Sequence, residues 1–226
     1  AAYAEYIAGA ARGSRRSVMV TLGTGIGVGV IIDGSDHGMA AEGGHMVIYY
    51  HGRHCTCGHD GCFEAYASAT ALINQTREAM LRHKESLLWE LCGGDLSKVN
   101  GKTPFDGRDA GDHTAIVVVA QYLEFLAYGI SNLINLLEPD VVVIGGGICA
   151  QGEKLLTPLR GLVHEMVYHP LFAERCRMAI AELGMRGGWG GAGGRAKRGV
   201  WGPKGVLRLA CTQPQERFFP FAGSFL

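Results

Sequence analysis

The amino-acid sequence predicts an α/β fold, because segments with strand patterns and segments with helix patterns alternate along the chain. Two β-branched runs, Val18–Leu22 and Val28–Ile32, are joined by a glycine-rich connection, which is the pattern of a β-hairpin. Apolar residues recur at steps of three and four across Thr114–Leu137, which predicts a long amphipathic helix. The segment Val141–Ile144 is short and fully apolar, as is typical of a buried strand.

Three further helices complete the expected set of elements. Residues 3–11 read as the end of a helix that stops at Gly13. Phe63–Lys84 reads as one long helix, and Gly152–Tyr168 offers another after the buried strand.

Size, charge and hydropathy limit the class of protein. With 226 residues, 47% of them hydrophobic, and a mean hydropathy of +0.10, the chain can form a sizeable core. Lysine plus arginine equal aspartate plus glutamate, 21 each, which argues against a dedicated surface for nucleic acid or membrane. The longest apolar runs, such as Ala115–Ala120, are far shorter than the roughly 20 residues that a membrane span needs. We therefore expect a soluble, cytoplasmic protein without a nucleic-acid or membrane partner in this portion.

One short loop carries a cluster of metal-binding residue types: His45, Cys55, Cys57 and Cys62. Four soft or borderline donors are what a closed tetrahedral zinc site needs. The alternatives are a disulfide with a spare thiol, or simply buried thiols. The four remaining cysteines are scattered singly, which suits a reducing compartment and favours a metal over a disulfide. The fourth ligand stays open, because three more histidines crowd the loop: His51, His54 and His59.

Two glycine runs lie beside the predicted strands. Gly23-Thr24-Gly25-Ile26-Gly27 is either a tight turn or a phosphate cradle, in which backbone N–H groups and the Thr24 hydroxyl face an anion. Gly145-Gly146-Gly147 is likewise a turn or a place where a flat ring such as adenine approaches the backbone. Neither run is a Walker A loop or a G-x-G-x-x-G fingerprint.

Taken together, these motifs resemble the ROK family of bacterial sugar kinases and repressors. The matching segments are L-G-T-G-I-G-x-G, E-G-G-H, C-T-C-G-H-D-G-C-F-E-A-Y-A-S and E-P-D-V-V-V-I-G-G-G. The resemblance runs from about Ala1 to Gly184 and is greatest to the ATP-dependent glucokinases. It implies an actin-like, ribonuclease-H-like ATPase fold with two lobes around a cleft. This chain would hold mainly the C-terminal lobe, with an inserted zinc loop.

The resemblance also assigns roles to individual residues. The implied zinc ligands are His45, Cys55, Cys57 and Cys62. The implied sugar-binding residues are Glu42, His45 and Glu64. The implied contacts to ATP, which family members use with magnesium, are Gly23, Thr24, Gly25 and Gly27 at the phosphates and Gly145, Gly146 and Gly147 beside the adenosine. Zinc with four protein ligands would be structural, and the second ring nitrogen of His45 would remain free for the sugar.

The implied reaction is transfer of a phosphoryl group from ATP to glucose, which gives glucose 6-phosphate. The alternatives are an N-acetylglucosamine or N-acetylmannosamine kinase, a sugar-sensing repressor with an upstream helix-turn-helix, and a non-catalytic zinc-stabilised fragment. A homodimer or higher homo-oligomer is expected, with the apolar face of Thr114–Leu137 as a candidate surface.

In the family, the catalytic base is the aspartate of an Asn-Asp pair just before an A-A-x-A-E segment. That segment is Ala1–Glu5 here, so we expect the base and the first phosphate loop upstream of Ala1 and no catalytic residue within the chain.

The C-terminal sequence departs from the family pattern. Family members continue after A-x-L-G with Asn-Asp-Ala-Gly, where this chain has Met185-Arg186-Gly187. A shift of one nucleotide turns codons for Asp-Ala-Gly into codons for Met-Arg-Gly. We therefore expect a lobe at residues 1–184, followed at 185–226 by a glycine- and arginine-rich tail that is a frameshift product or disordered.

Overall fold

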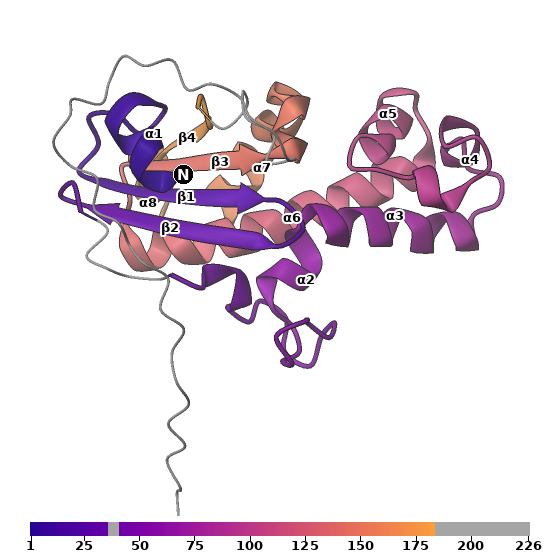
Figure 1. The fold of residues 1–226 in the computed structure, drawn as a ribbon, viewed down its shortest axis with the longest axis horizontal. Helices are drawn as coiled ribbons and strands as arrows, with labels where there is room; N and C mark the ends of the chain where they lie inside the picture. Colours follow the sequence, from indigo (N-terminus) through magenta and orange to yellow (C-terminus); the bar gives the residue numbers. More distant parts are fainter. Residues whose placement is uncertain (36–40, 184–226) are drawn as a thin grey trace, which may run out of the picture. The chain divides into compact units, whose positions relative to one another are not determined.

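The computed structural model describes residues 1–35 and 41–183, in which strands and helices alternate as predicted. The tail at residues 185–226 lies outside the described residues. The elements, in chain order, are α1 (Ala2–Ala8), β1 (Arg16–Leu22), β2 (Ile26–Ile32), η1 (Gly43–His45), α2 (Phe63–Ala67), α3 (Ala69–Arg82), α4 (Leu88–Leu91), η2 (Leu96–Lys98), α5 (Thr103–Asp109), α6 (His113–Leu137), β3 (Val141–Gly146), η3 (Gly147–Gln151), α7 (Glu153–Met166), α8 (Pro170–Arg175) and β4 (Arg177–Ile180), as Figure 1 shows.

A mixed four-stranded sheet with the order β2-β1-β3-β4 organises the described residues. The predicted hairpin is confirmed: β1 pairs antiparallel with β2, with Val18 opposite Val30. β1 also pairs in parallel with β3, with Val18 opposite Val142, and β3 pairs in parallel with β4. Both glycine runs therefore follow strands that point the same way, and they lie at the same end of the sheet (Figure 1).

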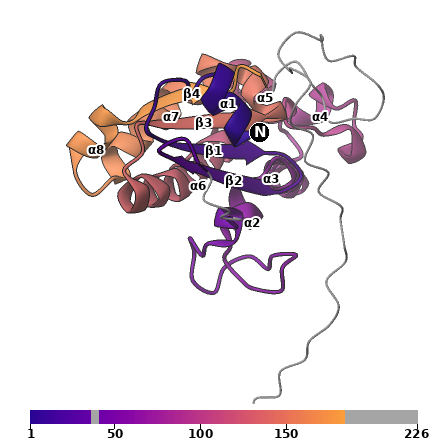
Figure 2. The same ribbon diagram turned by 60° about the vertical axis from the view of Figure 1, so that its left-hand side comes forward.

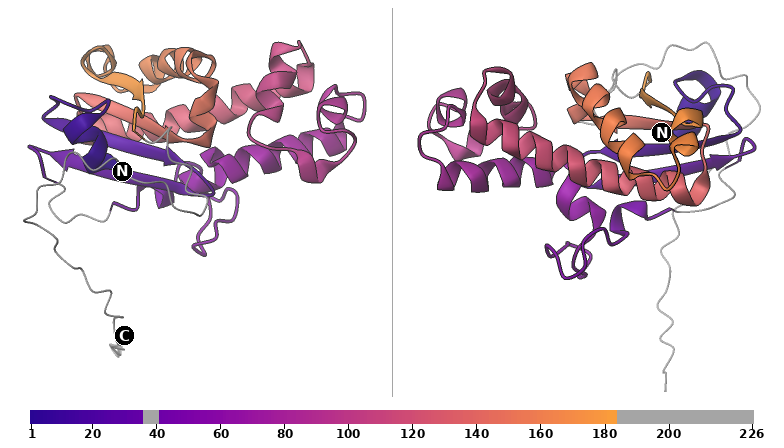
Figure 3. Two further views of the ribbon diagram at one scale, coloured as in Figure 1. Left: turned by 45° about the horizontal axis from the view of Figure 1, so that its top comes forward. Right: turned by 180° about the vertical axis from the view of Figure 1, so that it is seen from behind.

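Side chains alternate between two buried faces along β1 and β3, as the period of two in a strand requires. Val20 and Ile144 belong to the large core that also contains the inward side of α6. Met19 and Val143 belong to a smaller core on the opposite face, beside Ala10 and the end of α1. In the right-hand view of Figure 3, which is seen from behind, α6 runs in front of the sheet and covers the face that carries the large core.

The long helix α6 is the central core helix of the described residues. Its predicted apolar positions are buried, with Tyr122, Leu126 and Ile130 fully enclosed. By length and composition α6 is apolar enough to cross a membrane, yet 61% of its most apolar stretch is buried within the protein, as in a core helix. The structure does not support the expectation that this apolar face serves a homodimer, because these side chains pack in the protein's own core.

The predicted helix over Phe63–Lys84 is divided at Ser68 into α2 and α3. Ser68 has extended backbone angles (φ −72°, ψ 164°), and its hydroxyl accepts a hydrogen bond from the Ala71 N–H at 3.0 Å, as an N-cap does. The Ala69 N–H donates to the Gly23 carbonyl at 2.9 Å instead of continuing the helix. The tip of the β1–β2 hairpin is thereby fastened to the junction of the two helices.

Several short elements carry no clear pattern in the sequence: α4, α5, α8 and β4. Helices of one or two turns do not display a clear 3.6-residue period. The strand β4 reads Arg-Met-Ala-Ile and pairs only with β3 among the described strands, so its identity depends on a tertiary contact.

The buried carboxylate of Glu5 connects the two ends of the described chain. Glu5 is 1% exposed, and its Oε2 accepts the N–H groups of Ala10 at 2.8 Å and Glu182 at 3.2 Å. Its Oε1 accepts the Leu183 N–H at 2.7 Å. One side chain thus satisfies three backbone donors and holds α1 against the segment that follows β4.

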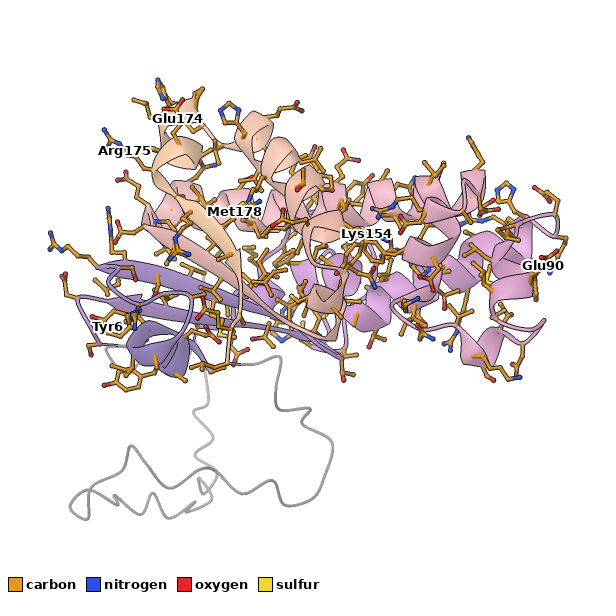
Figure 4. All side chains as sticks on the ribbon, turned by 90° about the horizontal axis from the view of Figure 1, so that it is seen from above. Tyr6, Glu90, Lys154, Glu174, Arg175 and Met178 are labelled. Carbon is orange, nitrogen blue, oxygen red and sulfur yellow. The ribbon has the colours of Figure 1, made fainter. Side chains whose placement is uncertain are left out.

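We expect Glu5→Gln to lower the free energy of unfolding by about 1–2 kcal/mol, because an amide NH₂ group would replace an acceptor oxygen among buried N–H donors. Urea denaturation measures the change. Glu90→Gln is the matched control, because Glu90 is exposed (Figure 4) and should change stability by less than about 0.5 kcal/mol. Equal stability of the Glu5 variant and the control would contradict this role of Glu5.

Candidate functional site

The four predicted metal ligands converge in the structure. The ligand atoms of His45, Cys55, Cys57 and Cys62 all lie within 4.8 Å of one another. Adjacent donors in a tetrahedral zinc site with sulfur and nitrogen ligands lie about 3.5–3.8 Å apart. Here Cys55 Sγ lies 3.7 Å from His45 Nδ1, and Cys57 Sγ lies 3.6 Å from Cys62 Sγ. Two separate pairs of donors therefore already have the spacing of a tetrahedral site.

Residues 46–62 form the cysteine loop, and backbone contacts hold it in place. Figure 2 shows that the loop extends from α2 on the side away from the sheet. An isolated β-bridge joins Val47 to Cys62, and the Phe63 N–H donates to the Met46 carbonyl at 2.8 Å. Gly58 and Gly61 have φ values of 91° and 82°, which favour glycine. These contacts bring the histidine at the start of the loop to the cysteines at its end.

The structure favours His45 over the competing histidines as the fourth ligand. His54 Nδ1 lies 2.9 Å from Asp60 Oδ1 and is exposed, and the His51 ring lies against Tyr50. His59 Nδ1 lies 3.5 Å from Cys57 Sγ but does not belong to the group of mutually close donors. The cysteines of the described residues are free thiols, so the disulfide alternative is not realised in this structure.

Ionisation of all the thiols in this cluster would need a nearby cation. Burial raises the pKa of the Cys62 thiol to about 12, and the neighbouring Cys57 and Cys55 add to the rise. In contrast, a hydrogen bond from the His59 backbone lowers the pKa of the exposed Cys57 thiol. Two neighbouring thiolates repel each other unless a positive charge lies between them, and a divalent metal supplies that charge. Three sulfurs and one imidazole fit zinc in particular.

The three predicted sugar-binding residues flank this loop in the chain, with Glu42 and His45 before it and Glu64 after it. Glu42 is exposed just before η1, and its carbonyl accepts the His45 N–H at 2.9 Å. His45 is half-buried, with Nδ1 toward the cysteines. Glu64, on the first turn of α2, is half-buried, and its Oε2 accepts the Ile26 N–H at 2.8 Å. A cavity of about 370 Å³ lies beside Glu64 and is also lined by Thr24 of the hairpin tip.

The glycine run Gly23–Gly27 forms the tip of the β1–β2 hairpin. The Gly23 N–H donates to the Gly25 carbonyl at 3.0 Å, and Thr24 is exposed at the tip. None of its three glycines has a positive φ. A Cβ on Gly23 or Gly27 would make only ordinary contacts, whereas a Cβ on Gly25 would overlap Glu64 Oε2.

The second run, Gly145–Gly147, ends β3 and opens η3. Gly146 has a φ of 102°, and a Cβ there would overlap the Leu22 carbonyl oxygen, so glycine is required. Gly147 has open space around it and lines a cavity of about 540 Å³. Ala69 at the start of α3 and Lys102 before α5 also line this cavity.

The α5 region also contributes to this cavity, although no motif in the sequence predicts it. Asn100, Lys102 and Asp106 line it, together with Lys154 of α7. The Arg108 Nη1 donates to the Lys154 carbonyl at 3.1 Å where α7 approaches α5 (Figure 4). The only signal in the sequence is the i,i+4 spacing of Lys102 and Asp106, whose side chains form an ion pair at 2.5 Å. Oppositely charged residues at this spacing are common on exposed helices, so the spacing does not indicate a binding site.

Comparison with known proteins agrees with this geometry. The sequence profile of the ROK family matches residues 1–198, so the chain belongs to the ROK family. The glucokinase of Thermotoga maritima is 39% identical over 163 residues, which cover 70% of this chain and 51% of that protein. The glucokinase of Halalkalibacterium halodurans is 38% identical over 200 residues, which cover 84% of this chain and 60% of that protein. The chain thus spans about half of the curated relatives it matches.

The family also includes regulators, and its fold is known from crystals. The xylose repressor of Bacillus subtilis is 32% identical over 176 residues, which cover 75% of this chain and 41% of that protein. The crystal structure of a ROK family glucokinase from Streptomyces griseus in complex with glucose and AMPPNP has a TM-score of 0.74 at 30% identity. The match covers 80% of this chain and 60% of that one. The predicted actin-like ATPase fold of the ROK sugar kinases is therefore confirmed.

Proposed function

We propose that this chain forms the sugar- and nucleotide-binding part of an ATP-dependent hexokinase whose substrate is glucose. The observation that carries the proposal is the contact between Glu64, a predicted sugar ligand, and Ile26 at the hairpin tip, where the ATP phosphates are expected. Phosphoryl transfer requires the acceptor hydroxyl and the phosphate donor to be held together. Similarity to glucokinases supports glucose as the acceptor.

On the sugar side, Glu42, His45 and Glu64 are the residues that we assign to the ring hydroxyls. Carboxylates accept hydrogen bonds from hydroxyl groups, and each can accept more than one. With Nδ1 of His45 directed at the cysteines, Nε2 remains for a hydroxyl.

On the nucleotide side, we assign the phosphates to Gly23, Thr24, Gly25 and Gly27 and the adenosine to Gly145, Gly146 and Gly147. The cavity of about 540 Å³ at Gly147 is large enough for a nucleoside. Magnesium bound to ATP would neutralise charge that builds up on the phosphates during transfer.

The metal that we assign to His45, Cys55, Cys57 and Cys62 is a structural zinc. Four protein ligands fill its coordination, so zinc would orient the His45 ring and brace the loop between η1 and α2.

Two other functions would use the same sugar-binding residues, Glu42, His45 and Glu64. A sugar-sensing repressor is favoured by the similarity to the xylose repressor, and an N-acetylhexosamine kinase would use both subsites with a larger sugar. A measurement of magnesium-ATP binding would distinguish a kinase from a repressor. Competition between glucose and N-acetylglucosamine for the site would distinguish a glucokinase from an N-acetylhexosamine kinase. We further propose a lobe ending near residue 184, a cytoplasmic setting and a homo-oligomeric state.

We expect Glu64→Gln to weaken glucose binding roughly five- to a hundred-fold with zinc content unchanged, because a charged acceptor of a sugar hydroxyl is lost. Glu42→Gln should act in the same direction. Glucose titration and a zinc assay on the same preparation provide the measurement. Glu78→Gln is the matched control: it lines the cavity beside Glu64 but pairs with Arg53 at 2.7 Å. Loss of zinc with intact glucose affinity in the Glu64 variant would reverse the assigned roles.

A further inference from the structure

The two carboxylate oxygens of Glu64 face different parts of the site. Oε2 accepts the Ile26 N–H at 2.8 Å at the tip of the hairpin. Oε1 faces the cysteine loop, where the Thr56 hydroxyl lies at 3.4 Å and Cys55 Sγ at 4.0 Å. The half-buried side chain of Glu64 therefore lies between the hairpin tip and the cysteine loop and contacts both.

The glycine at position 25 is explained by this carboxylate. Gly25 does not have a positive φ, so the backbone conformation itself does not require glycine. A Cβ at this position would overlap Glu64 Oε2 and approach its Cδ at 2.9 Å. Gly25 therefore makes room for Glu64 against the turn, in addition to any role in exposing N–H groups to an anion.

The hairpin tip has two anchors outside its own strands. The Ala69 N–H donates to the Gly23 carbonyl at 2.9 Å on one side of the turn, and Glu64 accepts the Ile26 N–H on the other. A turn fixed on both sides holds its N–H groups in one arrangement, which lowers the cost of ordering them around a phosphate.

We infer that Glu64 positions the glycine turn Gly23–Gly25 for the nucleotide phosphates, so that one carboxylate serves both the sugar and the nucleotide subsites. This inference rests on the proposed function. Oε2 holds the turn while Oε1 takes a sugar hydroxyl in place of Thr56. Glu64 is thus a positioning residue for the nucleotide, besides being a ligand of the sugar.

The test compares magnesium-ATP with adenosine as calorimetric ligands of the zinc-loaded chain. Glu64→Ala should weaken ATP binding about three- to ten-fold, the effect of one hydrogen bond, and change adenosine binding by less than about two-fold. Glu64→Gln should restore ATP affinity, because its amide oxygen can still accept the Ile26 N–H, although the same variant loses sugar affinity. Glu90→Ala, at an exposed carboxylate of α4 outside the cavities described above, should leave both nucleotide affinities unchanged.

A second pair of variants tests the contact at Gly25 independently of nucleotide. Gly25→Ala should destabilise the wild-type protein, and the destabilisation should be at least halved in a Glu64→Ala background, because the clash is then removed.

The outcomes are distinct. No ATP binding by the wild-type protein would refute the nucleotide half of the proposed function, and this inference with it. Normal ATP affinity of Glu64→Ala, or an equal loss for ATP and adenosine, would overturn the inference and leave the proposed function standing. Equal destabilisation by Gly25→Ala in both backgrounds would also overturn it.

Discussion

Replacing Cys62 with serine should abolish stoichiometric zinc binding. A structural zinc site contributes roughly 10–16 kcal/mol of binding free energy, so one of four ligands accounts for about 3 kcal/mol, or a hundred-fold in affinity or more. Cys62, the last residue of the cysteine loop, is fully buried, so no water molecule has easy access to replace the lost ligand. Elemental analysis after dialysis against a weak chelator measures the loss.

The neighbouring histidines supply the controls for this experiment. Cys57→Ser and His45→Ala should lose zinc as Cys62→Ser does. His54→Ala and His59→Ala should retain one zinc per chain, because neither ring belongs to the group of mutually close donors. Retention of zinc by Cys57→Ser together with its loss from His54→Ala would show that the ligand assignment is wrong.

Features encoded within one short segment could be predicted from the sequence. The hairpin, the helix α6 and the strand β3 each carry a complete hydrophobic pattern, and the structure confirms all three. The cysteine cluster followed from donor type and spacing along a glycine-jointed loop, whereas His45 as the fourth donor was implied only by the resemblance to the ROK family.

Features that depend on contacts between distant segments could not be predicted. The break at Ser68 depends on the hydrogen bond from the Ala69 N–H to Gly23, 46 residues earlier in the chain. The cavity at Gly147 is completed by Lys102 and Asn100, whose segment has no motif. The glycine run at the hairpin tip predicts a turn or a phosphate cradle, whereas its central glycine also accommodates Glu64.

A similar close packing governs the position of Phe63, which lies between Cys62, a proposed zinc ligand, and Glu64, a proposed sugar ligand. Phe63 is fully buried, and its ring lies against Gly129 in the middle of α6. A Cβ on Gly129 would overlap three carbons of that ring. The absence of a side chain at this point of α6 therefore lets α2 approach closely enough to hold the site.

Gly129→Ala should lower the free energy of unfolding by about 1–2 kcal/mol. Alanine is favoured over glycine inside a helix by about 1 kcal/mol. However, overpacking a rigid buried ring costs about 1–3 kcal/mol and occasionally more. Here the added methyl group would overlap three ring carbons of Phe63, and the backbone of α6 that carries it cannot move away easily. The steric cost should therefore outweigh the gain in helix propensity. Denaturant unfolding with zinc held in excess measures the difference.

Gly161→Ala in α7 is the matched control, because Gly161 is exposed and a Cβ there would meet nothing within 4 Å. It should stabilise the protein by about 0.5–1 kcal/mol, through helix propensity alone. Phe63→Leu should cost less in the Gly129→Ala background than in the wild type, because leucine lacks the ring atoms that clash. Gly129→Ala should also weaken zinc binding, since any shift of Phe63 moves the adjoining Cys62. A Gly129 variant as stable as the Gly161 variant would show that this packing does not position the site.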